Sequence, residues 1–445
     1  MASDWEGVSV SPGGSLLDPD PDWTRLDSGV SGLRCSQIQI DRGRDSEFED
    51  TDTGTCEVDF RDRYGALDST AVASLVSAPL AIAIRNPVTD TWWPQFRGHI
   101  ERNASTLPRS KVKLDTTLTA VDAFDYFSNV QLIPGLAGFA NAQVNRSGNV
   151  FYEDAGFDER ILAILGDILW PVELSSVFTG NVICAESIYS STDSAFQALQ
   201  EAVDAEYPDM ANQYVDPRGH YQAHGRYARF DPESVAASAS DWDFNSWIVG
   251  DDAACNADPE NVVRLFEPFS FAESRTEIRN AALAYPQDTD KSDLADFVVV
   301  DSSSRTAHGT RTWLAENLKV AEETTIGLTA KEWCQYIAQS VVDNYAQPTP
   351  RLDTITVRTQ RPHGKYGPAA WDFLCRADIS DRVTVRTTHP GGGGFSSVEF
   401  FIEGISMTIR PHRYDLDTGW PIVDKVCKLS PAAHYGTKTF GILPT

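Results

Sequence analysis

The clearest alternation of apolar and polar positions lies in residues 378–412. Val383 and Val385 alternate with polar neighbours, which is the period of a strand with one buried face. The glycine run at 391–394 cannot hold regular structure, so it favours a turn. A second strand pattern follows over residues 398–409. This stretch therefore predicts a long β-hairpin.

The apolar parity of the second strand changes at Gly404. Val398, Phe400 and Ile402 share one parity, whereas the apolar residues from Ile405 onward have the other. A single unpaired residue produces such a change, so we interpret Gly404 as part of a β-bulge with positive φ that bends the hairpin. Long bent hairpins are typical of barrels and curved sheets.

A fainter version of the pattern occurs at residues 81–103. In this comparison Ile82 and Ile84 parallel Val383 and Val385, and Gly98 parallels Gly404. The connections differ in length, and two unrelated hairpins could agree this well by chance. We favour a duplicated structural unit, with Gly98 and Gly404 as its structural glycines.

The remaining patterns predict a mainly β (α+β) fold with two antiparallel β-barrel domains and an α/β domain between them. Helical spacing in 158–170 and 195–207, beside a hairpin that turns at 216–219, marks the middle domain. The expected division is a flexible acidic N-terminal arm (1–30), a first barrel (31–129), the small α/β domain (130–235), a second barrel (236–428) and a C-terminal tail (429–445).

One helix is predicted inside the second barrel, over residues 330–345. Thr329 and Glu332 have the spacing of a capping box, in which each side chain bonds the other residue's main-chain N–H. Leu328 and Trp333 occupy the positions of a hydrophobic staple, and Trp333 begins the apolar face of the helix. These residues predict a firmly anchored helix.

The composition excludes several classes of protein. With 64 acidic and 37 basic residues, the formal charge of −27 disfavours a nucleic-acid-binding protein. We find no apolar run long enough to span a bilayer and no signal peptide, so we expect a protein that folds in the cytosol without inserting into a membrane. The seven scattered cysteines include no CxxC pair, which predicts buried thiols rather than disulfides or a zinc ribbon.

Candidate catalytic patterns are weak. His220 and His224 have the four-residue spacing of helical metal ligands, but they flank a hairpin turn and belong to no HExxH motif. The glycine run at 391–394 lacks the lysine of a phosphate-binding loop. Paired carboxylates occur in stretches that read as exposed loops. We therefore expect no catalytic residues, no cofactor and no metal site, and the chain is not expected to be an enzyme.

The order of several motifs resembles minor tail proteins of the baseplate hub type, particularly those from tailed phages of actinobacteria. The motifs are IQIDRGRDSEFEDTDTGTCEVDFRDRYGALD, APLAIAIRN with FRGHIE, ERILAILGDILWPVE, YVDPRGHYQAHGRYARF, and LCRADISDRVTV with FIEGISMTI. The similarity covers about residues 31–413. The chain departs from the family at Ala307-His308, where an aromatic residue is usual, and in its acidic arm.

The resemblance implies that both barrels have the tail-tube fold and that three chains form a hub ring. Three chains with two barrels each would place six units around one axis, joining a sixfold tail tube to a threefold tip. The implied partners are other copies of the chain, distal tail or tail-tube proteins above, tip or fibre proteins below, and the C-terminus of a tape measure protein in the channel. DNA would be a partner only in passage. The implied location is the tip of a virion tail (siphovirus type), assembled in the host cytoplasm.

An acidic channel would let DNA pass without sticking. The candidate channel-lining residues are Glu47, Glu49, Asp50, Asp59 and Asp62. Two other functions remain open. The middle domain could bind a receptor or glycan, or the chain could be a tail-associated cell-wall hydrolase, which would require an added catalytic domain.

Overall fold

The computed structural model describes residues 6–27, 33–62, 67, 75–106, 114–133, 143–144, 149–229, 244–267, 275–322, 324–348, 351–388, 395–414 and 420–432. The glycine run at 391–394 and most of the predicted C-terminal tail lie outside these residues.

The strands near the N-terminus form one antiparallel part of a large sheet, in the order β3-β4-β7-β6-β5-β1-β2. We call them the N-terminal strand set: β1 (Val8–Val10), β2 (Thr24–Arg25), β3 (Leu33–Gly43), β4 (Asp52–Asp62), β5 (Pro79–Asn86), β6 (Thr91–Thr106) and β7 (Leu114–Val121). β1 lies in the segment predicted as a flexible arm. Its residues are buried and paired with β5, so that prediction is wrong for this segment.

The C-terminal strand set follows the order β17-β16-β22-β23, with β24 and β21 continuing beyond β23. It comprises β16 (Ser246–Gly250), β17 (Val262–Arg264), β21 (Thr354–Arg358), β22 (Arg382–Thr388), β23 (Phe395–Tyr414) and β24 (Pro421–Pro431), with helices α4 (Asp252–Ala257) and α7 (Gly367–Arg376). The predicted hairpin is the β22–β23 pair. Helix α7 was not predicted from the sequence.

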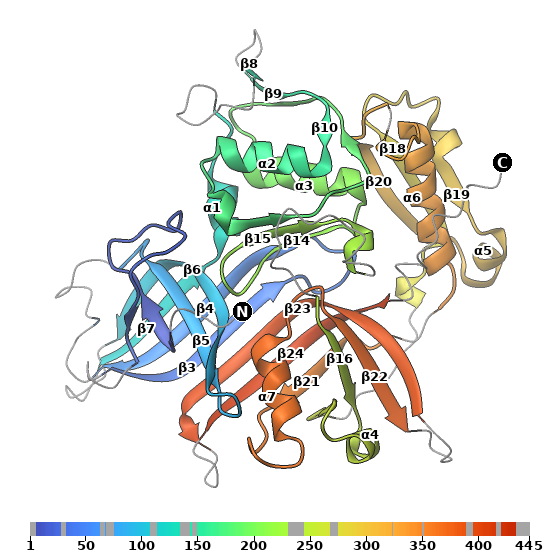
Figure 1. Cartoon of the computed structure of the whole chain (residues 1–445). Coiled ribbons are helices and arrows are strands. Elements are labelled where there is room, and N and C mark those ends of the chain that lie inside the picture. Colours follow the sequence, from blue (N-terminus) through green and yellow to red (C-terminus); the bar gives the residue numbers. More distant parts are fainter. Residues whose placement is uncertain are drawn as a thin grey trace.

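The two strand sets are joined edge to edge, and Figure 1 shows them side by side in the lower half of the molecule. β3 pairs with β23, from Ile38 opposite Ile409 to Gly43 opposite Gly404. Among the described residues, neither set closes into a barrel, although a main-chain hydrogen bond of 2.9 Å from Phe266 to Thr356 links the β17 side to β21. The mainly β prediction is confirmed, whereas the strands of the two predicted β-barrel domains form, among the described residues, open and connected sheets.

Four consecutive strands of each set have the same order. The sequence β4, β5, β6, β7 is arranged as β4-β7-β6-β5, and β21, β22, β23, β24 is arranged as β21-β24-β23-β22. All the pairings within both groups are antiparallel. This arrangement favours the interpretation that the chain contains a repeated unit.

The strand register also repeats, and it includes a bulge. In β6, Glu101 is the extra residue opposite β7, because Ile100 pairs with Ala120 and Arg102 with Thr119. In β23, Glu403 is the extra residue opposite β24. The matching predicted from sequence is therefore out of register: Arg102, not Gly98, corresponds to Gly404. Gly404 adjoins the bulge as predicted, but its φ is not positive.

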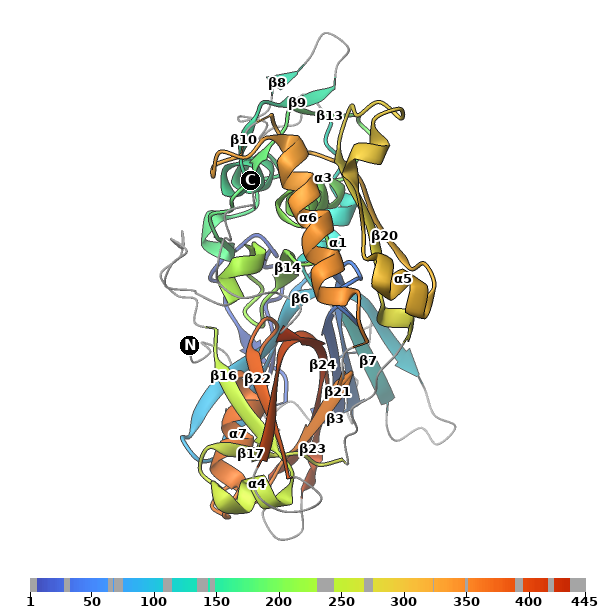
Figure 2. The same cartoon turned by 90° about the vertical axis from the view of Figure 1, so that its right-hand side faces the viewer.

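The upper half of the molecule contains most of the helices (Figures 1 and 2). Its helices are α1 (Ala123–Asn129), α2 (Phe157–Asp167), α3 (Ala195–Glu206), α5 (Ser302–His308), α6 (Ala330–Tyr345) and the short 3-10 turns η1 (Val172–Leu174), η2 (Arg226–Arg229), η3 (Arg275–Glu277) and η4 (Leu294–Phe297). Its strands are β8 (Gln143–Val144), β9 (Val150–Tyr152), β10 (Ala155–Gly156), β11 (Ser175–Val177), β12 (Ile183–Cys184), β13 (Ser187–Tyr189), β14 (Asn212–Val215), β15 (Tyr221–His224), β18 (Ala281–Pro286), β19 (Val298–Val300) and β20 (Thr312–Leu318).

Helix α6 belongs to this upper half and not to the C-terminal strands. It packs lengthwise on the sheet β19-β18-β20 (Figure 2). The buried Trp333 donates from Nε1 to the carbonyl of Ala205 in α3, at 3.1 Å. The helix itself has the predicted bounds, but it is not part of a second barrel.

The apolar core is divided between the two halves. One cluster unites α1–α3 with β18–β20 and α6, and the other fills the space between the two strand sets and α7. Residues 281–346 therefore share a core with the middle of the chain, unlike the predicted division. All seven cysteines are buried thiols, as expected. Within the described part of the chain, no helix combines the length and apolar content needed to cross a lipid bilayer.

Candidate functional site

The joint between β3 and β23 requires glycine on both strands. Gly43 has φ +87°, a conformation that L side chains rarely adopt, and a Cβ there would overlap the carbonyl oxygen of Glu403. A Cβ on Gly404 would lie 2.5 Å from the carbonyl oxygen of Arg44. These glycines allow the two main chains to approach where the strand sets meet.

Glu403, the extra residue of the β23 bulge, points into a buried cluster of charges. Its carboxylate accepts hydrogen bonds from Arg44 Nε at 2.9 Å, from Arg229 Nη1 at 2.6 Å and from the hydroxyl of Ser430. Its main-chain carbonyl also accepts from the Arg44 N–H, at 3.0 Å. The glutamate thus joins the residue that follows β3, the upper half and β24 at one point.

Charge pairing keeps Glu403 ionised despite its burial. Burial alone would raise the pKa of this carboxyl, but the nearby Arg229 and Arg44 charges outweigh it and hold the pKa well below its usual range. The Arg229 guanidinium also lies 5.2 Å from the centre of the Phe401 ring. Because each charge is buried, removing one member would leave its partners without compensation.

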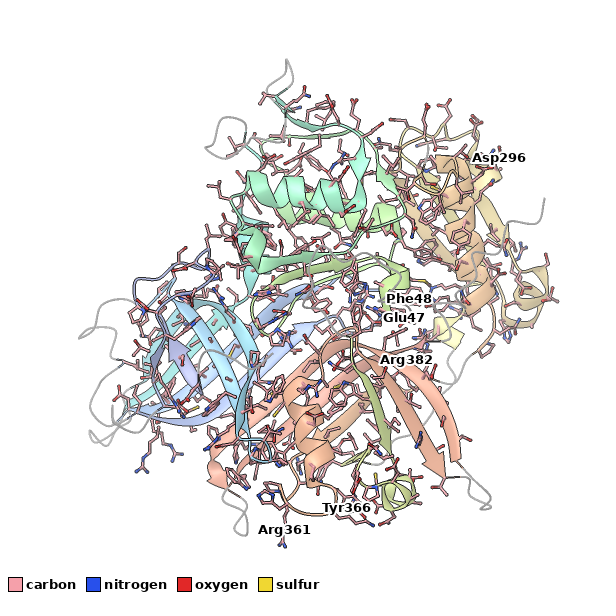
Figure 3. The ribbon with its side chains drawn as sticks, viewed as in Figure 1. Glu47, Phe48, Asp296, Arg361, Tyr366 and Arg382 are labelled. Atoms are coloured by element: carbon pink, nitrogen blue, oxygen red, sulfur yellow. The ribbon has the colours of Figure 1, made fainter. Side chains whose placement is uncertain are left out.

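A second buried ion pair ties the loop after β3 to the upper half. Glu47 is fully buried and binds Arg351, which precedes β21. Arg351 also lies 3.1 Å from Glu277. The next residue, Phe48, makes an edge contact with Tyr345 at the end of α6, with ring centroids 4.8 Å apart. Figure 3 places Glu47 and Phe48 where the upper half and the strand sets meet.

The candidate channel residues fall into two groups. Glu47 and Asp62 are completely buried within the chain, so they cannot face a channel between chains, and the prediction is wrong for them. Asp62 instead accepts from the main-chain N–H of Leu67, at 2.8 Å. Asp59 is half-buried and bonded to Thr117, and Glu49 and Asp50 are exposed, so these three stay candidates.

The predicted structural residues are placed as follows. Thr329 and Glu332 form the capping box, with Thr329 N–H donating to Glu332 at 2.9 Å and Thr329 Oγ1 accepting from the Glu332 N–H at 3.3 Å. Trp333 is fully buried. A Cβ on Gly98 would overlap the carbonyl oxygen of Val121, so this glycine permits a close approach of β6 and the end of β7.

The two histidines considered as metal ligands contact different partners. His224 is fully buried, and its Nε2 lies 2.8 Å from Ser380 Oγ. Burial and the Arg229 charge lower its pKa to about 3, so the ring is neutral. His220 lies beside Asp216. Among the described residues, no group of three or more His, Cys, Asp or Glu side chains is arranged to hold a metal ion.

A cavity of about 650 Å³ opens between β1, β3 and the tips of the β5–β6 and β23–β24 hairpins. Its charged side chains pair with one another: Arg25 Nη1 lies 2.7 Å from Glu6 and its Nε 2.8 Å from Asp27. Arg85 likewise pairs with Asp90. Both guanidinium groups of the cavity are therefore neutralised, and three carboxylates against two arginines leave one carboxylate in excess.

The charged partners of Glu403 were missed by sequence reasoning. Arg44 lies in the R-G-R turn, and Arg229 follows the middle hairpin, but neither position carries a local signal of burial. The informative signal was the parity change beside Gly404, because a bulge adds one residue whose side chain leaves the normal alternation. That residue is Glu403.

The fold resembles that of a solved tail protein. A tail protein from Neisseria meningitidis MC58 superposes with a TM-score of 0.52 and 12% identity, covering 95% of this chain and 97% of that one. A 43 kDa tail protein of prophage MuSo2 from Shewanella oneidensis gives a TM-score of 0.47 and 11% identity, with coverages of 95% and 97%. No protein-family model and no curated protein matches the chain. At this identity, the first comparison shows a shared fold.

Proposed function

We propose that the chain is a structural component of a phage tail tip, in which three copies form a hub ring around a channel for DNA. The repeated strand order carries the proposal. Each copy contributes two similar units, β4–β7 and β21–β24, set side by side by the β3–β23 joint. Three copies would present six units to a sixfold tube and three to a threefold tip.

The proposed partners follow from that position. Distal tail or tail-tube proteins would lie above the ring, tip or fibre proteins below it, and the C-terminus of a tape measure protein in the channel. The role is structural rather than enzymatic, and the ring would assemble in the host cytoplasm and act in the virion. The fold shared with the Neisseria tail protein supports this placement.

The copy number tests the proposal. Native mass spectrometry of the purified protein should give three times 49.0 kDa, or 147 kDa. A map of the tail tip should show threefold symmetry for this protein. A single copy in each tail, or six copies, would contradict the ring.

Channel charge offers a second test of the same function. Three chains carry a formal charge of 3 × (−27) = −81. If Glu49, Asp50 and Asp59 face the channel, their carboxylates would repel the phosphates of passing DNA, although the exposed Arg61 shares the face of Asp59 on β4. Replacing all three with lysine should leave the ring assembled but slow DNA ejection, most at low salt, where screening is weakest. Unchanged ejection kinetics at low salt would remove these residues from the channel.

Receptor binding by the upper half is the second candidate. The observation that favours it is a group of exposed apolar side chains: Val144 is 53% exposed, Ile188 52%, Leu169 56% and Val172 67%. The loop carrying the last two is held firmly, because Tyr126 donates to the Ile168 carbonyl at 2.8 Å. Leu169→Asp with Val172→Asp should reduce adsorption of assembled phage to cells. Normal adsorption would exclude this surface.

A further inference from the structure

The β3–β23 joint shows how one strand set pairs with another. β22 pairs with the first part of β23, up to Phe401 opposite Arg382. Beyond the bulge at Glu403, the same side of β23 pairs with β3, beginning at Gly404. Beyond the end of its pairing with β22, this edge of β23 is therefore covered by β3, a strand of the N-terminal set.

β6 presents the corresponding surface in the N-terminal set. β5 pairs with β6 as far as His99, and the bulge at Glu101 follows. β6 continues to Thr106 with β7 on its other side. Within the described part of the chain, no strand pairs with residues 102–106 on the side that β5 leaves, although Asn103 donates from Nδ2 to the carbonyl of Leu67 at 3.2 Å. Both Glu101 and Arg102 are exposed, and Val76, beside this edge, is 48% exposed.

The C-terminal set presents the matching side. In the repeated register Thr356 of β21 corresponds to Asp59 of β4, which pairs with Gln37 of β3. In the N-terminal set β3 lies beside β4. In the C-terminal set the segment containing Phe266 lies in the equivalent position beside β21, and the N–H of Phe266 donates to the carbonyl of Thr356. Phe266 is 44% exposed, and its ring lies 3.5 Å beneath the guanidinium of Arg358.

We infer that a second copy of this chain docks on the β6 edge, so that the Phe266 side of its C-terminal set lies against Val76, Glu101 and the strand to Thr106. This inference rests on the proposed ring and specifies which surfaces of neighbouring copies meet in it. Because the contact joins two different surfaces, each copy of a pair still has one surface available for a further copy. Repeating the contact gives a closed ring when the rotation between copies divides a full turn. The apolar side chains of Val76 and Phe266 suit each other, whereas the guanidinium of Arg358 is already paired with Asp424 of its own chain.

The contact between copies differs from the joint inside the chain in one respect. Arg102 occupies the register position of Gly404. The main chains therefore cannot approach there as closely as Gly43 and Gly404 do, because a Cβ on either glycine would meet the opposite main chain. The docking is expected to be made by side chains rather than by a continuous strand ladder.

Cysteine cross-linking tests the contact directly. The variant with Arg102→Cys and Phe266→Cys in the same full-length chain is treated with a short bismaleimide, both as purified protein and in assembled tails. The native cysteines are all buried, so they give little background. Covalent trimers are expected from the double variant and none from either single variant. Dimers from a single variant would overturn the inference, because like surfaces would then meet.

A control pair and an association measurement complete the test. Leu169→Cys with Leu314→Cys, on exposed positions of the upper half, should give no covalent trimer. Val76→Asp or Phe266→Asp should weaken association about tenfold or more, by placing a carboxylate in an apolar contact. If the double cysteine variant forms a ring of normal mass without cross-linking, and the aspartate variants associate normally, these surfaces are refuted while the proposed function stands. A single copy in assembled tails would refute both.

Discussion

Glu101 and Glu403 occupy the same position in two strand sets of the same order, yet their surroundings are opposite. Each is the extra residue of a bulge opposite the next strand. Glu101 is exposed, whereas Glu403 is fully buried among arginines. The repeated backbone therefore does not determine the environment of the bulge. The elements that pack against the strand determine the environment of the bulge residue. At Glu403 these elements are β3 and the turn that carries Arg229.

The largest contrast is expected from removing each glutamate. Glu403→Ala leaves the buried charges of Arg44 and Arg229 without their partner, which should cost about 3–5 kcal/mol of unfolding free energy. Glu101→Ala, the matched control, should change stability by no more than about 0.5 kcal/mol. Urea unfolding of both variants measures the difference. Equal effects would mean that the burial of Glu403 contributes nothing beyond the bulge.

The next contrast compares the residues that follow the bulges. A valine at Gly404 would bring its Cβ to 2.5 Å from the carbonyl oxygen of Arg44, so Gly404→Val should cost roughly 1–3 kcal/mol and loosen the β3–β23 joint. Arg102→Val is the control at the same register position, where a side chain is already present. Unchanged unfolding of Gly404→Val would show that the joint tolerates a wider separation.

The pH dependence sharpens the comparison at Glu403. Its pKa is lower in the folded protein than in the unfolded chain, so its contribution to stability is present above the ordinary glutamate pKa of about 4.3 and is lost as the pH falls toward the folded value. The stability difference between the native protein and Glu403→Gln should therefore shrink in acid. Denaturant unfolding at pH 7 and pH 3 measures this, and Glu101→Gln serves as the exposed control. A difference that grows in acid would reverse the assigned sign.

The smallest effect is expected outside the strand sets. Thr329→Ala removes the N-cap of α6 and should cost about 0.5–2 kcal/mol. Because α6 packs in the upper half, its effect should add to that of Glu403→Ala, as distant sites usually do. Hydrogen exchange should show faster exchange at the start of α6 only. Rapid exchange of the whole helix in the native protein would contradict its anchoring by the cap.

The sequence predicted the parts of the fold that depend on neighbouring residues. Alternation located β22 and β23, and the Thr329–Glu332 spacing located the start of α6, because both signals arise within a few residues. Helix α7 was missed, although Pro368 stands in its first turn, a common position for proline.

The sequence could not predict which elements meet. Trp333 indicated a buried helix face, but it carried no information that the face packs on α3 and on the sheet β19-β18-β20 rather than on the C-terminal strand set. Glu47 was assigned to a channel because acidic turns are usually solvated, and its burial depends on Arg351 in a distant segment. The register of the repeat was misassigned because two glycines, Gly98 and Gly404, looked equivalent. The apolar parity changes after Ile402, but Ile100 is followed by polar residues, so the bulge there leaves no such signal.

The long separation between Arg44 and Glu403 affects how the protein is made. The two residues are 359 positions apart in the chain. At a synthesis rate of about 5–20 residues per second, Arg44 leaves the ribosome roughly 20–70 s before Glu403 is made. The first strands must therefore wait for the last ones, and pairing over so long a separation is slow. The β3–β23 joint makes the completion of translation a condition for the final fold, so an incomplete chain that lacks β23 cannot set the two strand sets side by side as the proposed ring requires.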